Sequence, residues 1–107
     1  MKKAILIYED EDKIHEILLD IAPSKNEIFK LLGGRQTFIG QWPDIDVVIL
    51  KAEDATVKNN NILPYPFGDE DTRGKILLIR MDENSEPQDF TLDEYNLFKH
   101  GNKCLAV

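Results

Sequence analysis

The stretch RQTFIGQWPDIDVVILKA, residues 35–52, decides the fold of this chain of 107 residues. RQTFIGQ predicts a strand, with Thr37 and Ile39 on one face and Phe38 on the other. WPDID predicts a turn, because proline fixes one backbone angle and the aspartate side chains favour local hydrogen bonds. DVVILKA, with four consecutive aliphatic residues, is the strongest strand signal in the chain. The two strands are therefore expected to pair as a hairpin.

A helix is predicted directly before this hairpin. Ser24 and Glu27 match the S-x-x-E capping box, whose side chains satisfy two free backbone N–H groups at the start of a helix. Gly33-Gly34 predicts the end of the helix, because glycine adopts the left-handed conformation of that position easily. The apolar face of the helix consists of three aliphatic residues, Ile28, Leu31 and Leu32.

Two interpretations remain open for residues 14–21. AILIY, residues 4–8, predicts a buried strand, and the acidic EDEDK that follows it must turn to solvent. Four apolar residues then have the spacing of a helix face, namely Ile14, Ile17, Leu18 and Ile21. A hairpin with the first strand, closed by EDEDK, accounts for the same residues equally well.

A long polar connection, residues 53–73, follows the central hairpin. Pro64 and Pro66 exclude a central strand there, because proline cannot donate to a sheet ladder. A loop of this length in a small domain is often functional. GKILLIRMD then predicts another strand, with aliphatic residues at positions 76–79.

The last helix is predicted from DENSEPQDFTLDEY, residues 82–95. Its first part is a turn, and Thr91 and Glu94 form a second capping box, T-x-x-E. We expect this helix to end at Gly101. The element order β-β-α-β-β-β-α predicts one α+β domain over residues 1–107. It has a mostly antiparallel sheet of about five strands, with two helices packed on one face.

The charge balance excludes some partners. The chain has 20 Asp and Glu against 13 Lys and Arg, and its formal net charge is -7. Such a surface repels phosphate backbones and anionic membranes, so we predict neither a direct nucleic-acid partner nor a membrane partner. Cys104 is the only cysteine, which excludes an internal disulfide and suits a reducing compartment. With no run of roughly 18 apolar residues, a soluble, intracellular protein is expected.

The long polar loop contains the candidate ligand-binding residues: Asn59, Asn61, Tyr65, Phe67 and Arg73. Asparagine amides both donate and accept hydrogen bonds, aromatic rings stack on planar groups, and a guanidinium binds carboxylate or phosphate. Together these side chains could form a small polar-aromatic pocket. The structural alternative is that Leu63 and Phe67 anchor the loop on the core while Arg73 pairs with nearby acids.

The acidic segments do not predict a metal site. A calcium loop that started at Asp82 would have Pro87 where the EF-hand has glycine, and Asp93 where it has a bidentate glutamate. The acidic runs at residues 9–12 and 69–71 are typical of a solvated surface. We therefore predict no metal ion and no cofactor.

No catalytic group is predicted either. His15 and His100 are the only histidines, and a nucleophile such as Cys104 must meet its base in space. The GGR at residues 33–35 lacks the Walker pattern, and a helix C-terminus repels anions. Whether the protein is an enzyme stays open, with a metal-dependent hydrolase that uses loop carboxylates as the least favoured hypothesis.

Three runs resemble a known family: LLGGRQTFIGQWPDIDVVIL, NNNILPYPF with DTRGKILLIRMD, and above all EPQDFTLDEY. They are similar to an uncharacterised domain family of large DNA viruses of algae and amoebae, and more distantly to a small phage domain of unknown function. The resemblance covers residues 3–98 and carries no catalytic residues with it. It implies a viral accessory protein made inside an infected cell, and it favours a strand over residues 14–21.

Two functions are predicted from these observations. The first is a non-enzymatic binding protein that acts on a host or viral protein, in the host cytoplasm or nucleus or in the virion. The alternative is a protein that binds or sequesters a small, nucleotide-like ligand through the loop from Asn59 to Arg73. A homo-oligomer would suit this alternative, because pockets of small domains often lie between subunits.

Overall fold

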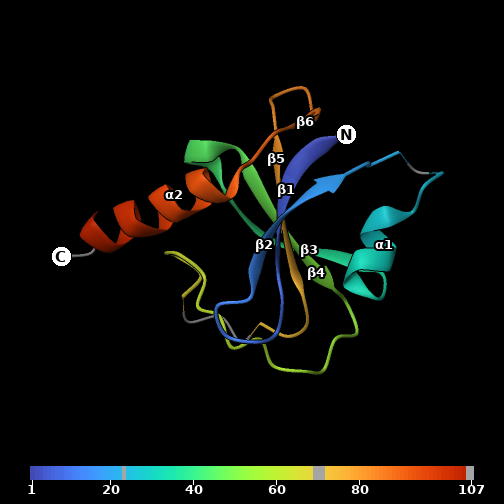
Figure 1. The fold of residues 1–107 in the computed structure, drawn as a ribbon, viewed down its shortest axis with the longest axis horizontal. Coiled ribbons are helices and arrows are strands. Elements are labelled where there is room, and N and C mark those ends of the chain that lie inside the picture. Colours follow the sequence, from blue (N-terminus) through green and yellow to red (C-terminus); the bar gives the residue numbers. More distant parts are fainter. Residues whose placement is uncertain (23, 69–71, 106–107) are drawn as a thin grey trace.

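The computed structural model describes residues 1–22, 24–68 and 72–105, with the backbone alone for residues 101–105. Figure 1 shows one twisted sheet with a short helix on one side and a longer helix on the other. The elements in chain order are β1 Lys2–Ile7, β2 Ile14–Leu19, α1 Glu27–Leu32, β3 Gln36–Trp42, the 3-10 helix η1 Pro43–Ile45, β4 Val47–Ala52, β5 Ile76–Met81, β6 Pro87–Gln88 and α2 Leu92–Leu105.

The sheet has the strand order β2-β1-β5-β4-β3, and every neighbouring pair is antiparallel. The predicted hairpin is confirmed as β3 and β4, and residues 14–19 form a strand that pairs with β1. β5 enters between β1 and β4, so Leu77 lies opposite both Leu6 and Leu50. The short β6, which the sequence did not predict, pairs with β5. The predicted α+β domain with an antiparallel sheet is confirmed.

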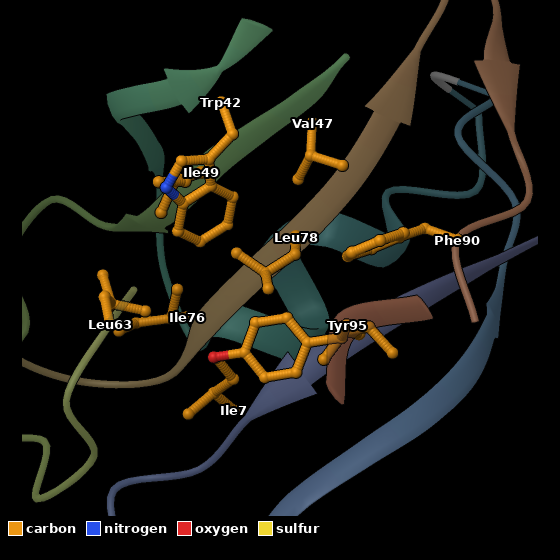
Figure 2. Packing of buried hydrophobic residues seen from close by; sticks show 10 residues of the cluster. Ile7, Trp42, Val47, Ile49, Leu63, Ile76, Leu78, Phe90 and Tyr95 are labelled. Atoms are coloured by element: carbon orange, nitrogen blue, oxygen red, sulfur yellow. The ribbon is translucent and has the colours of Figure 1, made fainter. Parts of the chain in front are cut away.

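Buried side chains form one core on each face of the sheet. Successive residues of β5 alternate between them: Ile76 and Leu78 face one core, and Leu77 and Ile79 face the other. Figure 2 shows the first core, where Tyr95 and Phe90 lie over the strands. We call this the α2 face. The second core includes Leu32 of α1, and we call it the α1 face.

The expectation that both helices pack on one face is therefore wrong. The central strands carry consecutive apolar residues, ILLI in β5 and VVIL in β4, rather than alternating polar and apolar ones. A strand that is apolar on both faces must be covered on both faces, which places α1 and α2 on opposite sides.

The start of α1 differs from the prediction. Its N-cap is Asn26, with φ 55° and no side-chain hydrogen bond, so the Ser24–Glu27 capping box is not formed. Instead, Glu27 Oε1 accepts a hydrogen bond from the backbone N–H of Asp20 at 3.4 Å. The helix end at Gly33 is confirmed, since Gly33 has φ 75° and donates its N–H to the carbonyl of Phe29 at 2.9 Å.

The capping box of α2 is confirmed. Thr91 Oγ1 accepts from the N–H of Glu94 at 3.2 Å, and Glu94 Oε1 accepts from the N–H of Thr91 at 3.1 Å. Glu16 of β2 adds a third acceptor, because its Oε1 accepts from the N–H of Leu92 at 2.9 Å. The expected end at Gly101 is wrong, since the backbone stays helical to Leu105. A glycine inside a helix costs only about 1 kcal/mol relative to alanine.

The substitution Glu94→Gln should reduce the pH dependence of stability. Burial acts to raise the pKa of Glu94. Arg80 lowers it by its charge and by a hydrogen bond from Nη1, 2.6 Å away, and Thr91 lowers it by further hydrogen bonds. The pKa therefore lies below its usual value of 4.5. A lowered carboxyl pKa stabilises the fold above the unfolded pKa, and the contribution is lost as the pH falls below about 4.5. Because the Arg80–Glu94 pair is partly exposed, we expect it to contribute less than about 1 kcal/mol to the free energy of unfolding.

Urea unfolding at a series of pH values, followed by the fluorescence of the single tryptophan, measures this difference. The free energy of unfolding of wild type should exceed that of Glu94→Gln near neutral pH and approach it in acid. Asp93→Asn is the control, because it removes an exposed charge from the same helical turn. A difference between wild type and Glu94→Gln that is constant with pH would contradict the assignment.

Candidate functional site

The structure places Asn59 in a buried hydrogen-bond network at the base of the long loop. Asn59 is only 4% exposed. Its Nδ2 donates to the carbonyl of Gly74 at 2.9 Å, and its Oδ1 accepts from the N–H of Asn61 at 2.9 Å. The backbone N–H of Asn59 also donates to the carbonyl of Thr72 at 3.0 Å. These bonds join the two ends of the loop.

Asn61 ties the loop to the turn between β1 and β2. Its Nδ2 donates to the carbonyls of Tyr8 and Asp10, each at 2.8 Å. Its Oδ1 accepts from the N–H of Asp12, also at 2.8 Å. Both predicted asparagines therefore lie together, and their amide groups hold the loop in place. The acidic run at residues 9–12 takes part through backbone atoms of Asp10 and Asp12, which bond to Asn61.

Phe67 anchors the middle of the loop on β3. Its ring packs edge-on against Trp42, with centroids 5.9 Å apart, and lies directly over the Cα of Gly40. A Cβ at position 40 would overlap this ring. Trp42 Nε1 donates to the carbonyl of Tyr65 at 3.1 Å, and Leu63 is buried in the core of the α2 face. Figure 2 shows Leu63 and Trp42 in this core.

Tyr65 and Arg73 are the most exposed of the predicted ligand-binding residues. The Tyr65 side chain is 76% exposed, and Arg73 Nη1 donates to the carbonyl of Thr56 at 3.1 Å. Arg73 also faces Lys58 in a short antiparallel bridge beside Asn59. None of the pockets described below is lined by any of the five predicted residues. Their role in binding a small molecule stays a prediction.

The structure has a groove on the α1 face, which is larger than the two pockets beside α1 described below. It has a volume of about 560 Å³, and we define it by its lining residues. Those from the sheet are Gln36, Phe38, Gln41, Val48, Leu50, Ile79 and Met81. Those outside the sheet are Ile21 and Ile28 of the α1 layer, Pro43 and Asp46 of the β3–β4 turn, and Asp82 and Ser85 of the β5–β6 turn.

The groove exists because α1 is short. Its six residues, Glu27–Leu32, cover part of β3 and β4 and leave the rest of that face open. The Phe38 side chain stays 58% exposed as a result. Val48 and Met81, which also line the groove, are partly buried. An exposed aromatic ring beside other apolar side chains makes this groove the candidate contact site of the structure.

One polar group of the groove carries a fixed charge. Asp82 Oδ1 accepts from the backbone N–H groups of Asn84 and Glu86, each at 2.9 Å, and Oδ2 accepts from Gln88 Nε2 at 3.0 Å. These hydrogen bonds, that of Glu86 first, lower the pKa of Asp82, although desolvation opposes them. The turn predicted to be unsuited to calcium thus uses this carboxylate to hold its own backbone.

Two smaller pockets lie beside α1, with volumes of about 270 and 500 Å³. Both are lined by Phe29 and Arg35, and Phe29 is 51% exposed. The Gly34 of the GGR sequence lines the second of them. They offer one phenyl ring and one guanidinium among acidic side chains, a less uniform surface than the groove.

Within residues 1–22, 24–68 and 72–100, no group of three or more His, Cys, Asp or Glu side chains is placed to hold a metal ion. His15 packs edge-on against Tyr8 at 5.3 Å. The acidic run at residues 69–71 and the side chain of Cys104 lie outside what the structure describes. In the described part of the chain, no helix is long and apolar enough to cross a membrane.

Sequence reasoning missed the groove. By pattern, Phe38, Val48 and Met81 are ordinary strand residues, and Asp46 is a turn former. The available signal was Phe38 on the strand face opposite Ile39, which indicates that both faces of β3 are apolar. Whether that second face is covered depends on the length and position of α1, which the sequence did not give.

Comparison with known proteins gives one match. The protein family described as a family of unknown function, DUF5880, matches residues 5–98, and the chain belongs to this family. No curated protein and no solved structure matches the chain. The expectation of an uncharacterised family is thereby confirmed, whereas the viral origin stays a prediction.

The substitution Asn59→Ala should destabilise the protein by about 1–3 kcal/mol, because it leaves the buried bonding partners of the amide without hydrogen bonds. Urea unfolding of the variant measures this change. The control is Asn60→Ala, since Asn60 is exposed and only its backbone N–H is bonded, to the carbonyl of Glu9. It should stay within about 0.5 kcal/mol of wild type. Equal effects of the two substitutions would contradict the anchoring role.

The substitution Gly40→Ala should destabilise the protein by about 1–3 kcal/mol, because the added methyl group forces the Phe67 ring off β3. The fluorescence of Trp42, which packs on that ring, should change as well. Gly34→Ala is the control, since its Cβ would make an ordinary 3.8 Å contact with Ala52. That change should alter stability by less than about 1 kcal/mol. Unchanged fluorescence in Gly40→Ala would count against the contact.

Proposed function

We propose that this member of a family of unknown function is a non-enzymatic binding protein that recognises another protein through the groove on the α1 face. The observation that carries the proposal is the open apolar surface around Phe38, a ring that is 58% exposed although it lies in the sheet. Val48 beside it is partly buried, and the buried Leu50 and Ile79 form the floor of the groove on β4 and β5.

The shape of the groove suits a protein segment better than a small molecule. Small-molecule sites are concave and enclose most of the ligand, with a few converging polar groups. This groove is open, and most of the side chains that line it from the sheet are apolar, which suits the apolar centre of a protein interface. Side chains of a partner would cover Phe38 and complete the layer that α1 begins.

The nature of the partner rests on the sequence. The resemblance of EPQDFTLDEY to proteins of large DNA viruses supports a host or viral protein as the partner. It also supports binding inside an infected cell, in the cytoplasm, the nucleus or the virion. The net charge of -7 disfavours nucleic acid and anionic membranes as the direct partner.

The substitution Phe38→Ser tests the proposal. It removes the exposed ring from the centre of the groove, so it should weaken retention of a specific partner from infected-cell extract by at least about tenfold. Leu97→Ser is the matched control, because Leu97 is 73% exposed and belongs to α2 on the opposite face. Affinity capture with quantitative mass spectrometry measures retention, and unfolding curves establish that both variants are folded. A partner that Phe38→Ser retains as well as Leu97→Ser does would contradict the proposal.

A further inference from the structure

The acidic side chains that line the groove come from two neighbouring turns. They are Asp46 of the β3–β4 turn and Asp82 of the β5–β6 turn. The same two turns, PDID at residues 43–46 and DENSE at residues 82–86, contain no lysine or arginine. The other lining residues of the groove are apolar, amide or hydroxyl side chains. The groove therefore has an apolar floor and two acidic turns.

Arg80, the cation nearest in sequence to the β5–β6 turn, does not neutralise these turns. Its Nη1 lies 2.6 Å from Glu94 Oε2, and its guanidinium lies 5.0 Å from the centre of the Phe90 ring. Glu94 and Phe90 lie on the α2 face. Arg80 points to the same face, because it lies directly opposite Val47, which belongs to the core of that face. The Nε of Arg80 donates to the carbonyl of Ile45 at 3.1 Å, which uses a further donor.

The backbone of Asp46 and the carboxylate of Asp82 are both held by hydrogen bonds. Asp46 has φ 57°, its N–H donates to the carbonyl of Pro43 at 3.3 Å, and its carbonyl accepts from the N–H of Met81 at 2.8 Å. Asp82 is held through its carboxylate by three donors. The turn backbone at Asp46 and the charge of Asp82 are thus in place before a partner arrives, so a cation can bind there without reorganising the turns.

We infer that the groove takes a short protein segment in which an apolar side chain lies next to lysine or arginine. This inference rests on the proposed function. The apolar side chain would cover Phe38 and Val48, and the cation would lie at Asp46 and Asp82. The hydrocarbon stem of lysine or arginine can also pack along Met81 while its charged end reaches the carboxylates.

The charge pattern also rejects other segments. An acidic segment would be repelled by Asp46 and Asp82 in the two turns. A purely apolar segment would leave these carboxylates partly desolvated and without a cation. The overall charge of -7 adds a long-range attraction for basic segments that salt weakens. Binding should therefore weaken as the ionic strength rises.

A library of random short peptides, displayed on yeast and selected on the full-length wild-type protein, tests the inference. Selected peptides should combine an aromatic or aliphatic residue with lysine or arginine, and Phe38→Ser should abolish their binding. Asp46→Asn should weaken binding about two- to fivefold and reduce its salt dependence, as expected for a partly exposed ion pair. Asparagine tolerates the backbone conformation of Asp46, so the fold should be kept.

Asp93→Asn provides the matched control, because it makes the same change in net charge at an exposed position on α2. It should leave the affinity and its salt dependence at wild-type values. If Asp46→Asn and Asp93→Asn act equally, or if the selected peptides lack basic residues, the inference is overturned while the protein-binding groove stands. If no peptide is selected, or if none depends on Phe38, the groove itself is overturned as a docking site, and the inference falls with it.

Discussion

The structure depends on a central strand that is buried on both sides. β5 lies between β1 and β4, and its residues Ile76, Leu77, Leu78 and Ile79 are each at most 2% exposed. Antiparallel sheets commonly keep one face in water, but these side chains require a covering layer on each face. The α2 face receives the start of α2 and part of the long loop, whereas the α1 face receives a helix of six residues. This unequal cover leaves the groove open.

The long loop is best understood as part of that covering layer. Leu63 fills the core of the α2 face, Phe67 packs on Trp42, and Asn59 and Asn61 satisfy the backbone where the loop meets its neighbours. Among the described residues, no buried side-chain nitrogen or oxygen lacks a hydrogen bond. A loop can thus be long and rich in asparagine because it has a large area of sheet to cover. Its length alone does not indicate a binding site.

The features that the sequence predicts correctly depend on local patterns. The hairpin of residues 36–52, the glycine end of α1 and the Thr91–Glu94 capping box all follow from residues close together in the chain. The Ser24–Glu27 box is not formed because Asn26 is the N-cap, which puts Glu27 at the first helical position, where its carboxylate accepts from the N–H of Asp20 instead. The sequence likewise did not predict the contact of Phe67 with Gly40 or the placement of the helices on opposite faces, because both depend on residues far apart in the chain.

The groove could not be predicted from the sequence either, because it depends on how much of the sheet α1 covers. Its acidic side chains come from the turns that connect β3 to β4 and β5 to β6. An open apolar strand face invites aggregation, and charged residues beside it act against that outcome. The β3–β4 and β5–β6 turns must be polar because they reverse the chain in water, and Asp46 and Asp82 of these turns line the same groove as Phe38 and Met81. Carboxylates in these turns therefore repel further copies of an acidic protein while they attract a basic segment. If the groove binds a basic segment as we propose, one arrangement of charge both protects the exposed face and selects what covers it.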